Sequence, residues 1–317
     1  MPQQYKLGTV EASEQLIRDV YIDLRRQLRK WASITHQTAQ ARMGYVGQHL
    51  VSVATGFPGG KSGARGRDLI ISKTEFGEIK TCYRVDQLGK CLDCGDVAAS
   101  IEDACQACSS ENIQRNDDSK WLIGIRNEAE FAELLDPVQY YLVLFDFVDL
   151  QAKQKTIRAS IWQVDPKTKG FLYCLIDYYL NIRSKSTSKA PFNLWPYDFK
   201  FQLMKPTLVY QSFILPDDSI KTELFPGRDK PKRMDFKLAT YLRSRALTAV
   251  ALERAATQFQ IVAPSRTKAG FIAALDNAVL TGKLERDTLI DALTNGVYLP
   301  LIETHIAKLP EKLKQHV

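Results

Sequence analysis

The chain has 317 residues, of which 45% are hydrophobic and 25% are charged, and its formal net charge is +7. These proportions are ordinary for a globular protein, and the length allows one large domain with an insertion or two domains. No apolar run reaches the roughly 18 residues that a membrane span needs, and the N-terminal stretch lacks the apolar core of a secretion signal. We therefore expect a cytoplasmic protein without a membrane partner, and its positive charge is compatible with a polyanionic partner.

The N-terminal part is predicted to contain two helices followed by a strand hairpin. Apolar residues spaced by three and four predict an amphipathic helix over 13–33, and a second helix is predicted over 41–55, before a stretch rich in glycine and proline. The basic, glycine-containing segment 61–67 is interpreted as a loop. Two short strands are predicted next, at 68–71 and 77–82.

The middle of the chain is predicted to add two long strands, and the C-terminal part is predicted to be helical. The nearly continuous apolar run 140–147 predicts a buried strand with 157–164 as its neighbour. Tyr197, Phe199 and Phe201 alternate with polar residues, which predicts a half-buried strand. Further elements are predicted as a strand at 121–125, a helix at 128–135, and Ala- and Leu-rich helices at 236–259, 268–280 and 286–306.

A change of composition near Pro231 predicts a domain boundary, with domains at 1–230 and 231–317 and residues 86–115 as an insertion into the first. Residues 225–268 contain ten Lys or Arg against three Asp or Glu. Such a basic segment is either a surface for the DNA backbone or a solvated helical face. The helical second domain is accordingly predicted to contact DNA or to form a dimer.

The predicted hairpin at 68–82 contains residues that suit phosphodiester hydrolysis. Glu78 and Lys80 lie two apart on one strand, so both side chains point to the same face, and Asp68 begins the preceding strand. Two carboxylates with the adjacent carbonyl of Ile79 make an oxygen-rich site suited to Mg²⁺, which lowers the pKa of a bound water. The ammonium of Lys80 can position that water. The alternative interpretation is a surface hairpin with an ion pair.

Residues 45–83 resemble the active-site segment of the PD-(D/E)XK nucleases, with Asp68, Glu78 and Lys80 at the positions of the motif. The resemblance implies that the Asp and the Glu bind the metal and that the Lys acts on the attacking water. The chain departs from the pattern at Arg67, which stands where the motif has proline.

Many members of this superfamily also place a glutamate on the preceding helix, and here Gln48 or His49 is the nearest candidate. As a whole the chain is similar to type II restriction endonucleases, and among them to the MamI-like group. This resemblance implies a restriction-endonuclease-like α/β fold, with a mixed sheet flanked by helices. It also implies double-stranded DNA as the partner, Mg²⁺ as the catalytic cofactor, and a homodimer that cuts both strands.

Four of the six cysteines form two Cys-x2-Cys pairs separated by ten residues: Cys91, Cys94, Cys105 and Cys108. In a chain without a secretion signal, such pairs favour a metal over disulfides. Four thiolates suit one tetrahedral zinc, which predicts a structural Zn²⁺ with no open position for catalysis. An iron–sulfur cluster or a redox pair is the alternative. Cys82 and Cys174 are interpreted as core thiols.

Basic residues in three places are candidate DNA contacts, because such cations can meet phosphates. They lie in the loop before the hairpin, in the Ser- and Thr-rich segment that follows residue 182, and in the predicted helix 236–259. The candidates are Lys61, Arg65, Arg67, Arg183, Lys185, Lys189, Arg243 and Arg245.

These observations together predict a Mg²⁺-dependent, sequence-specific DNA endonuclease of the type II restriction class. One alternative is a modification-dependent or repair nuclease with the same active site. Another alternative, from a different class, is a zinc-bearing DNA-binding module without activity, in which the hairpin carboxylates are incidental.

Overall fold

The computed structural model describes residues 5–35, 37–38, 40, 44–60, 67–185, 191–234 and 238–317. The chain forms two compact units, which we name the sheet unit and the helical unit. The sheet unit comprises Met1–Ile123, Asp136–Val164 and Thr207–Arg233, and the helical unit comprises Gly124–Leu135, Asp165–Pro206 and Met234–Val317. The chain passes from the sheet unit to the helical unit for the last time after Arg233, close to the boundary predicted near Pro231. The helical unit differs from the predicted second domain because it also includes two earlier segments.

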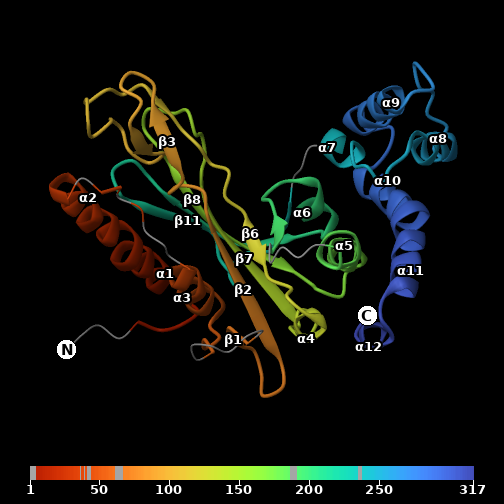
Figure 1. Ribbon diagram of the computed structural model, residues 1–317, viewed down its shortest axis with the longest axis horizontal. Coiled ribbons are helices and arrows are strands. Elements are labelled where there is room, and N and C mark those ends of the chain that lie inside the picture. The colour runs from red at the N-terminus through yellow and green to blue at the C-terminus, as the bar shows by residue number, and fades with distance from the viewer. Residues whose placement is uncertain are drawn as a thin grey trace. The chain divides into compact units, whose positions relative to one another are not determined.

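A mixed sheet forms the centre of the sheet unit (Figure 1). Its strand order is β1 (Leu69–Ile70), β2 (Phe76–Tyr83), β7 (Gln139–Phe147), β8 (Ile157–Val164), β10 (Thr207–Ile214) and β11 (Ile220–Leu224), and β12 (Lys232–Arg233) also pairs with β10. Strands β2 and β7 are parallel, and their described neighbours in this sheet pair antiparallel. Strand β7 is buried at every position after Gln139, as its continuous apolar run predicts. A mixed α/β architecture is therefore confirmed.

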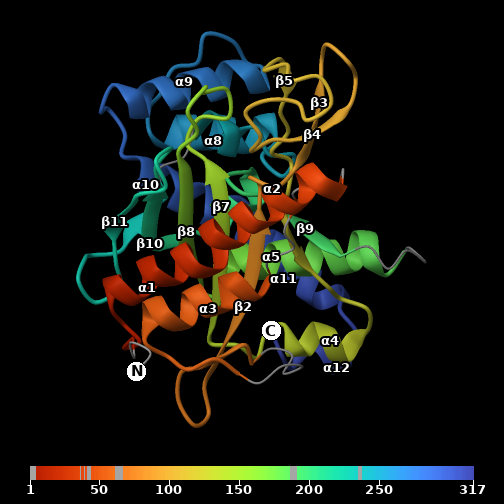
Figure 2. The same cartoon turned by 90° about the vertical axis from the view of Figure 1, so that its left-hand side faces the viewer.

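Helices from the N-terminal segment cover one face of this sheet (Figure 2). Helix α1 (Val10–Ile17), the π-helical segment η1 (Arg18–Asp23) and helix α2 (Leu24–Thr35) follow one another without a break, where the sequence predicts a helix over 13–33. The next helix is α3 (Gly44–Thr55). Ile79 and Val143 of the sheet belong to the same buried cluster as Leu50 of α3, so the odd-numbered side of β2 faces the helices.

Helix α3 lies unusually close to β2. A Cβ atom built on Gly47 would be 2.0 Å from Oγ1 of Thr81, well inside any normal contact. Glycine at this position therefore allows the helix to rest directly on the strand, and this contact determines where the next residue of the helix, Gln48, is placed.

The cysteine segment forms a small separate sheet within the sheet unit. Its strands are β3 (Leu88–Cys91), β4 (Val97–Ala99) and β5 (Ile113–Gln114), in the order β4-β3-β5. Strand β6 (Trp121–Ile123) follows. The indole Nε1 of Trp121 donates to the carbonyl of Val143 at 2.8 Å, and this bond ties the returning chain to the main sheet.

The long helices of the helical unit lie where the sequence predicts them. Residues 268–280 are helical as predicted, and the predicted helix 286–306 is present as α10, η3 and α11. No helix among the described residues is long and apolar enough to cross a bilayer. The elements of this unit are α4 (Glu128–Glu133), α5 (Lys169–Tyr178), η2 (Tyr179–Arg183), β9 (Phe192–Leu194), α6 (Phe199–Leu203), α7 (Leu238–Leu242), α8 (Ala249–Gln258), α9 (Lys268–Leu280), α10 (Arg286–Leu293), η3 (Thr294–Tyr298), α11 (Leu299–Lys308) and α12 (Glu311–Lys314).

The strand predicted around Tyr197, Phe199 and Phe201 is wrong, because the chain forms the short helix α6 there. Tyr197 has a positive φ of 62°, which ends any extended run. Asp198 then acts as the helix N-cap, since its carboxylate accepts the backbone N–H of Phe201 at 3.0 Å. Of the three aromatic side chains, Phe201 is fully buried.

The single helix predicted over 236–259 is also wrong. Helix α7 ends at Leu242, and α8 begins after Thr248, whose hydroxyl caps it by accepting the N–H of Ala251. Arg243 and Arg245 therefore lie in the turn between two helices and not within a helix. Polar residues that cap and turn the chain outweigh the helical propensity of the neighbouring alanines here.

Candidate active site and metal centre

The structure brings Asp68, Glu78 and Lys80 together at the β1–β2 hairpin. Glu78 and Lys80 project from the same face of β2, and the ammonium of Lys80 hydrogen-bonds Oε1 of Glu78. Asp68 lies directly before β1, and its Oδ2 accepts the backbone N–H of Ile79 at 2.9 Å. Its Oδ1 accepts Nε2 of Gln48 at 3.1 Å, so helix α3 also holds this carboxylate.

Beyond β1, no strand of the described residues pairs with this edge of β2. Its pairing with β1 is confined to Gly77 and Phe76, so Ile79 lies beyond the end of β1, and its N–H is taken by Asp68 instead of by a strand. The N–H and C=O of one residue in a strand point to the same side. The carbonyl of Ile79 therefore faces the same open edge as the Asp68 carboxylate.

The environment of Glu78 favours a cation. Its side chain is buried, with 6% of the residue exposed, and burial is the main cause that raises the pKa of Glu78. The charge of Lys80 lowers it, and the nearby carboxylate of Asp68 raises it further. Oε2 of Glu78 is buried and has no hydrogen-bond partner among the described residues. A buried carboxylate oxygen without a partner, next to a second carboxylate, is chemically suited to a hard divalent ion.

Backbone contacts on the outer side of β1 fix the position of Asp68. The N–H of Gly60 donates to the carbonyl of Asp68 at 2.7 Å, and the N–H of Ile70 donates to the carbonyl of Pro58 at 2.9 Å. A Cβ atom on Gly60 would be only 1.9 Å from the carbonyl oxygen of Arg67. The glycine- and proline-rich stretch around Gly60 predicts only the end of a helix, but the close packing of backbone against backbone requires glycine here.

Arg67, at the position where the sequence resemblance expects a proline, is anchored by an aromatic ring. Its guanidinium carbon lies 4.6 Å from the centroid of Phe76, a typical cation–π separation. Phe76 and Glu78 are on the same face of β2 and about 7 Å apart along the strand. The Arg67 cation is thus held on the face of the sheet that carries Glu78 and Lys80.

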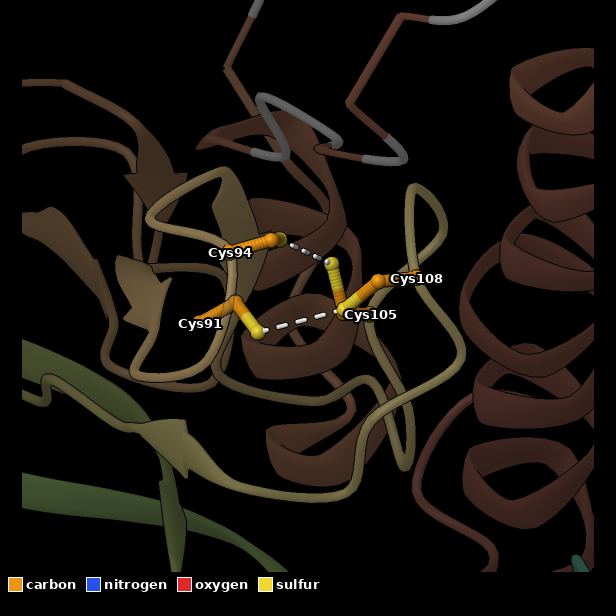
Figure 3. Close-up of side chains that lie close together, drawn as sticks. All are labelled: Cys91, Cys94, Cys105 and Cys108. Carbon is orange, nitrogen blue, oxygen red and sulfur yellow. Dashed lines mark hydrogen bonds between the residues drawn. The ribbon is translucent and has the colours of Figure 1, made fainter.

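The four clustered cysteines converge as predicted from their spacing (Figure 3). Their sulfurs all lie within 4.8 Å of one another, with Cys91 and Cys108 at 3.6 Å and Cys94 and Cys105 at 3.6 Å. A tetrahedral site with metal–sulfur bonds of about 2.3 Å has sulfurs roughly 3.8 Å apart. The arrangement therefore fits one metal ion.

Each cysteine pair is followed by a residue with positive φ. Gly95 (φ 80°) donates its N–H to the carbonyl of Cys91 at 3.0 Å, and Ser109 (φ 60°) donates to the carbonyl of Cys105 at 2.8 Å. The two turns are thus alike, although only the first has the glycine that sequence reasoning expects. The backbone N–H of Cys94 is the main cause that lowers the pKa of Cys91 to about 6, whereas the pKa values of Cys94 and Cys108 are raised. Cys91 is therefore the thiol of this cluster that most favours the thiolate form, which binds metals.

The other predicted cysteines and cations have varied surroundings. Cys82 and Cys174 are buried, as expected for core thiols. The guanidinium of Arg183 donates to the carbonyls of Ile125 and Arg126 at 2.9 and 2.7 Å, which is a structural role that the sequence did not indicate.

The remaining candidate DNA contacts are exposed or lie outside the described residues. Lys185 is exposed and donates to Asn181 at 3.3 Å, and Arg243 and Arg245 are exposed in the α7–α8 turn. The predicted contacts at Lys61, Arg65 and Lys189 are outside the described residues.

Comparison with known proteins identifies the family. The family model described as MamI restriction endonuclease matches residues 30–239, which is well over half of the chain and includes both the hairpin and the cysteine cluster. Neither the curated proteins nor the solved structures gave a match. The chain therefore belongs to the MamI restriction endonuclease family, and as a restriction endonuclease it is a DNA-binding nuclease.

Proposed function

We propose that this protein is a type II restriction enzyme that hydrolyses phosphodiester bonds of double-stranded DNA with Mg²⁺, using Asp68, Glu78 and Lys80. The observation that carries the proposal is the buried oxygen of Glu78 that lacks a partner and lies beside Asp68 and Lys80. The hairpin position of these residues, on a mixed sheet with helices on one face, also supports a PD-(D/E)XK core.

Three groups would hold the metal: the carboxylates of Asp68 and Glu78 and the main-chain carbonyl of Ile79. The Asp68 carboxylate and the Ile79 carbonyl lie at one edge of β2, and the Glu78 carboxylate projects from the adjoining face of the strand. When bound, Mg²⁺ stabilises the charge on the phosphate and lowers the pKa of a water ligand. Asp68 is already oriented by Gln48 and by the N–H of Ile79, so little reorganisation of this carboxylate is needed.

Lys80 supplies the proton chemistry in this proposal. Its ammonium contacts Glu78, and its side chain is partly exposed to solvent, at 27%. It can therefore reach a water molecule beside the two carboxylates, orient it, and assist the loss of its proton. Arg67, held against Phe76 on the same face, would bind a neighbouring phosphate of the DNA backbone.

The cysteine cluster is proposed to hold a structural Zn²⁺. Four thiolates close the coordination shell, so the ion would carry no reaction. Its role would be to order residues 86–115, which connect the active-site strand β2 to the rest of the sheet, because zinc binding is coupled to local folding.

The enzyme is proposed to act as a homodimer, because two active sites are needed to cut both strands and twofold symmetry matches a palindromic target. Its proposed location is the cytoplasm. The C-terminal helices, including Arg243 and Arg245, are proposed either to contact the DNA backbone or to form the dimer contact. The remaining cations Lys61, Arg65, Arg183, Lys185 and Lys189 are further candidates for DNA contacts.

The decisive experiment is a digest of plasmid DNA by purified protein with Mg²⁺, compared with the variants Lys80→Ala and Lys73→Ala. Lys73 is an exposed residue in the turn of the same hairpin, so it is a matched control. Discrete bands from the wild type and Lys73→Ala, with no cutting by Lys80→Ala, are expected. Cutting only of methylated DNA would favour a modification-dependent nuclease, and DNA binding without cutting would favour a non-catalytic module. Wild-type cutting by Lys80→Ala would refute the assigned site.

A further inference from the structure

A polar cavity lies within the sheet unit, with a volume of about 330 Å³. It is bounded by η1 and α2, by the loop between β7 and β8, by the turn between β10 and β11, and by residues that follow β4. Five cations line it: Arg25, Arg26, Arg29, Lys153 and Lys155. The carboxylates in its lining are those of Asp103 and Asp218, so the lining is cationic.

The cavity is separate from the proposed active site. Tyr140 of β7 pairs with Glu78, and Phe147 at the other end of β7 pairs with Ile157, which lines the cavity. Tyr140 and Phe147 are seven residues apart on β7, so the proposed active site and the cavity are separated by roughly 24 Å along the strand. Ile157 also belongs to the buried cluster beneath the N-terminal helices, whereas Glu78 and Lys80 project from the opposite face.

The cation of Lys155 is buried but incompletely satisfied. The residue is 8% exposed, and its ammonium bonds to Asp103 at 2.9 Å. The side chain of Asp103 is itself 75% exposed, so water competes for it. An ammonium can donate three hydrogen bonds, and among the described residues the Lys155 ammonium donates one, to Asp103. Burying such a group is costly unless its donors are matched, and an anion in the cavity would match them.

Two further cations are available to the same anion. The guanidinium of Arg29 makes a long bond of 3.4 Å to the carbonyl of Ile101 and has no carboxylate partner among the described residues. Lys153 lies 3.7 Å from Glu111, with both side chains largely exposed, and an exposed pair of this kind contributes little. Arg25 and Arg26, in contrast, are paired with carboxylates.

We propose that this cavity is a binding site for a phosphate group, held by Arg29, Lys153 and Lys155. A planar guanidinium donates two parallel bonds to phosphate oxygens, and charge-assisted bonds of this kind are strong. The volume is also in the range of small-molecule sites. The phosphate belongs either to a free phosphomonoester, such as a mononucleotide, or to the backbone of DNA. In either case the site is distinct from the centre that cleaves DNA.

The test uses the full zinc-loaded protein and two variants of α2. Arg29→Gln removes a cavity cation, and Lys30→Gln removes the adjacent exposed cation that does not line the cavity. Isothermal calorimetry would measure binding of inorganic phosphate and of a 5′-mononucleotide without divalent ions, and of a short duplex in Ca²⁺. Arg29→Gln should weaken the binding either of the two small anions or of the duplex by about tenfold, as expected for a charged hydrogen bond. Lys30→Gln should weaken neither.

The pattern of loss identifies the source of the phosphate. Weaker binding of inorganic phosphate and the mononucleotide indicates a free phosphomonoester, and weaker binding of the duplex alone indicates the DNA backbone. Equal effects of Arg29→Gln and Lys30→Gln, or no effect of either, would overturn the proposal. Binding of phosphate that is abolished by Lys80→Ala would overturn it as well, because the anion would then occupy the active site.

Discussion

Replacing Gly60 by alanine should impair cleavage although this residue carries no functional group. Gly60 packs its backbone against Arg67 and Asp68, and its N–H bonds the Asp68 carbonyl. A Cβ atom at this position would be 1.9 Å from the Arg67 carbonyl oxygen, and real Cβ atoms essentially never approach closer than 3.0 Å. Either the loop or the Arg67–Asp68 backbone must therefore move by more than 1 Å.

The movement should reach the proposed active site through Asp68, which is a proposed metal ligand. Its carboxylate makes bonds of 2.9 Å to Ile79 and 3.1 Å to Gln48, and a shift of this size breaks them. Misplacing a reacting group by about 1 Å lowers a rate by about 100-fold. Overpacking in a well-packed region costs about 1–3 kcal/mol of stability, which a folded chain of this size can tolerate.

Single-turnover cleavage with saturating Mg²⁺ measures this effect. Gly59→Ala is the matched control, because a Cβ there would be 3.7 Å from the Asp68 carbonyl oxygen, an ordinary contact. Gly60→Ala should be about 100-fold slower than Gly59→Ala, with the zinc content and circular dichroism of both unchanged. If the two folded variants cleave at the same rate, the loop has moved instead of Asp68, and the reasoning is refuted.

Three other predictions address the charge of Glu78, the cysteine turns and the anchored arginine. Burial raises the pKa of Glu78, so the folded metal-free protein keeps a proton on this carboxylate at pH values where the unfolded chain has lost it. The protonated carboxyl of Glu78 therefore contributes to stability at low pH, and this contribution is lost as the pH rises through the raised pKa. The metal-free variant Glu78→Gln should therefore have a higher melting temperature than the wild type at pH 8 but not at pH 4, and Mg²⁺ should not stabilise it. An equal difference in melting temperature at both pH values would contradict this expectation. Ser109→Gly should raise the stability of the zinc-loaded protein by about 1 kcal/mol, and Gly95→Ala should lower it by a similar amount. If thermal melts show that both variants are stabilised, or that both are destabilised, the turn at Ser109 is not strained. Arg67→Ala should reduce the salt slope of DNA binding in Ca²⁺ by about one, and Phe76→Leu should weaken binding less; an unchanged slope would show that Arg67 meets no phosphate.

The parts of the site that depend on local spacing could be predicted from the sequence. Glu78 and Lys80 share a face because strand side chains alternate, and two Cys-x2-Cys pairs are enough to bring four sulfurs together. The partners of Asp68 could not be derived in this way. Its bonds to Gln48 and Ile79 depend on how closely α3 approaches β2 at Gly47, which no local pattern specifies.

The incorrect predictions share a physical cause. Alternating aromatic residues around Phe199 fit a strand, but the carboxylate of Asp198 caps a helix there. Alanines around residue 250 fit a long helix, but Ser244 and Thr248 interrupt it by bonding to nearby backbone groups. In both cases short polar side chains decided the local structure, and such side chains contribute little to periodic patterns.

The way the helical unit is assembled bears on how this chain can change in evolution. Helix α5 lies within the family-matched span, and its Tyr173 packs against Tyr298 and His305, with ring centroids 5.2 and 5.7 Å apart. Both partners come from the region beyond residue 239. The C-terminal helices are thus not an independent module that could be exchanged between relatives by recombination. Substitutions on α5 and on η3–α11 are constrained by one another, so homologues should show correlated changes at these positions, even though they are more than a hundred residues apart in the chain.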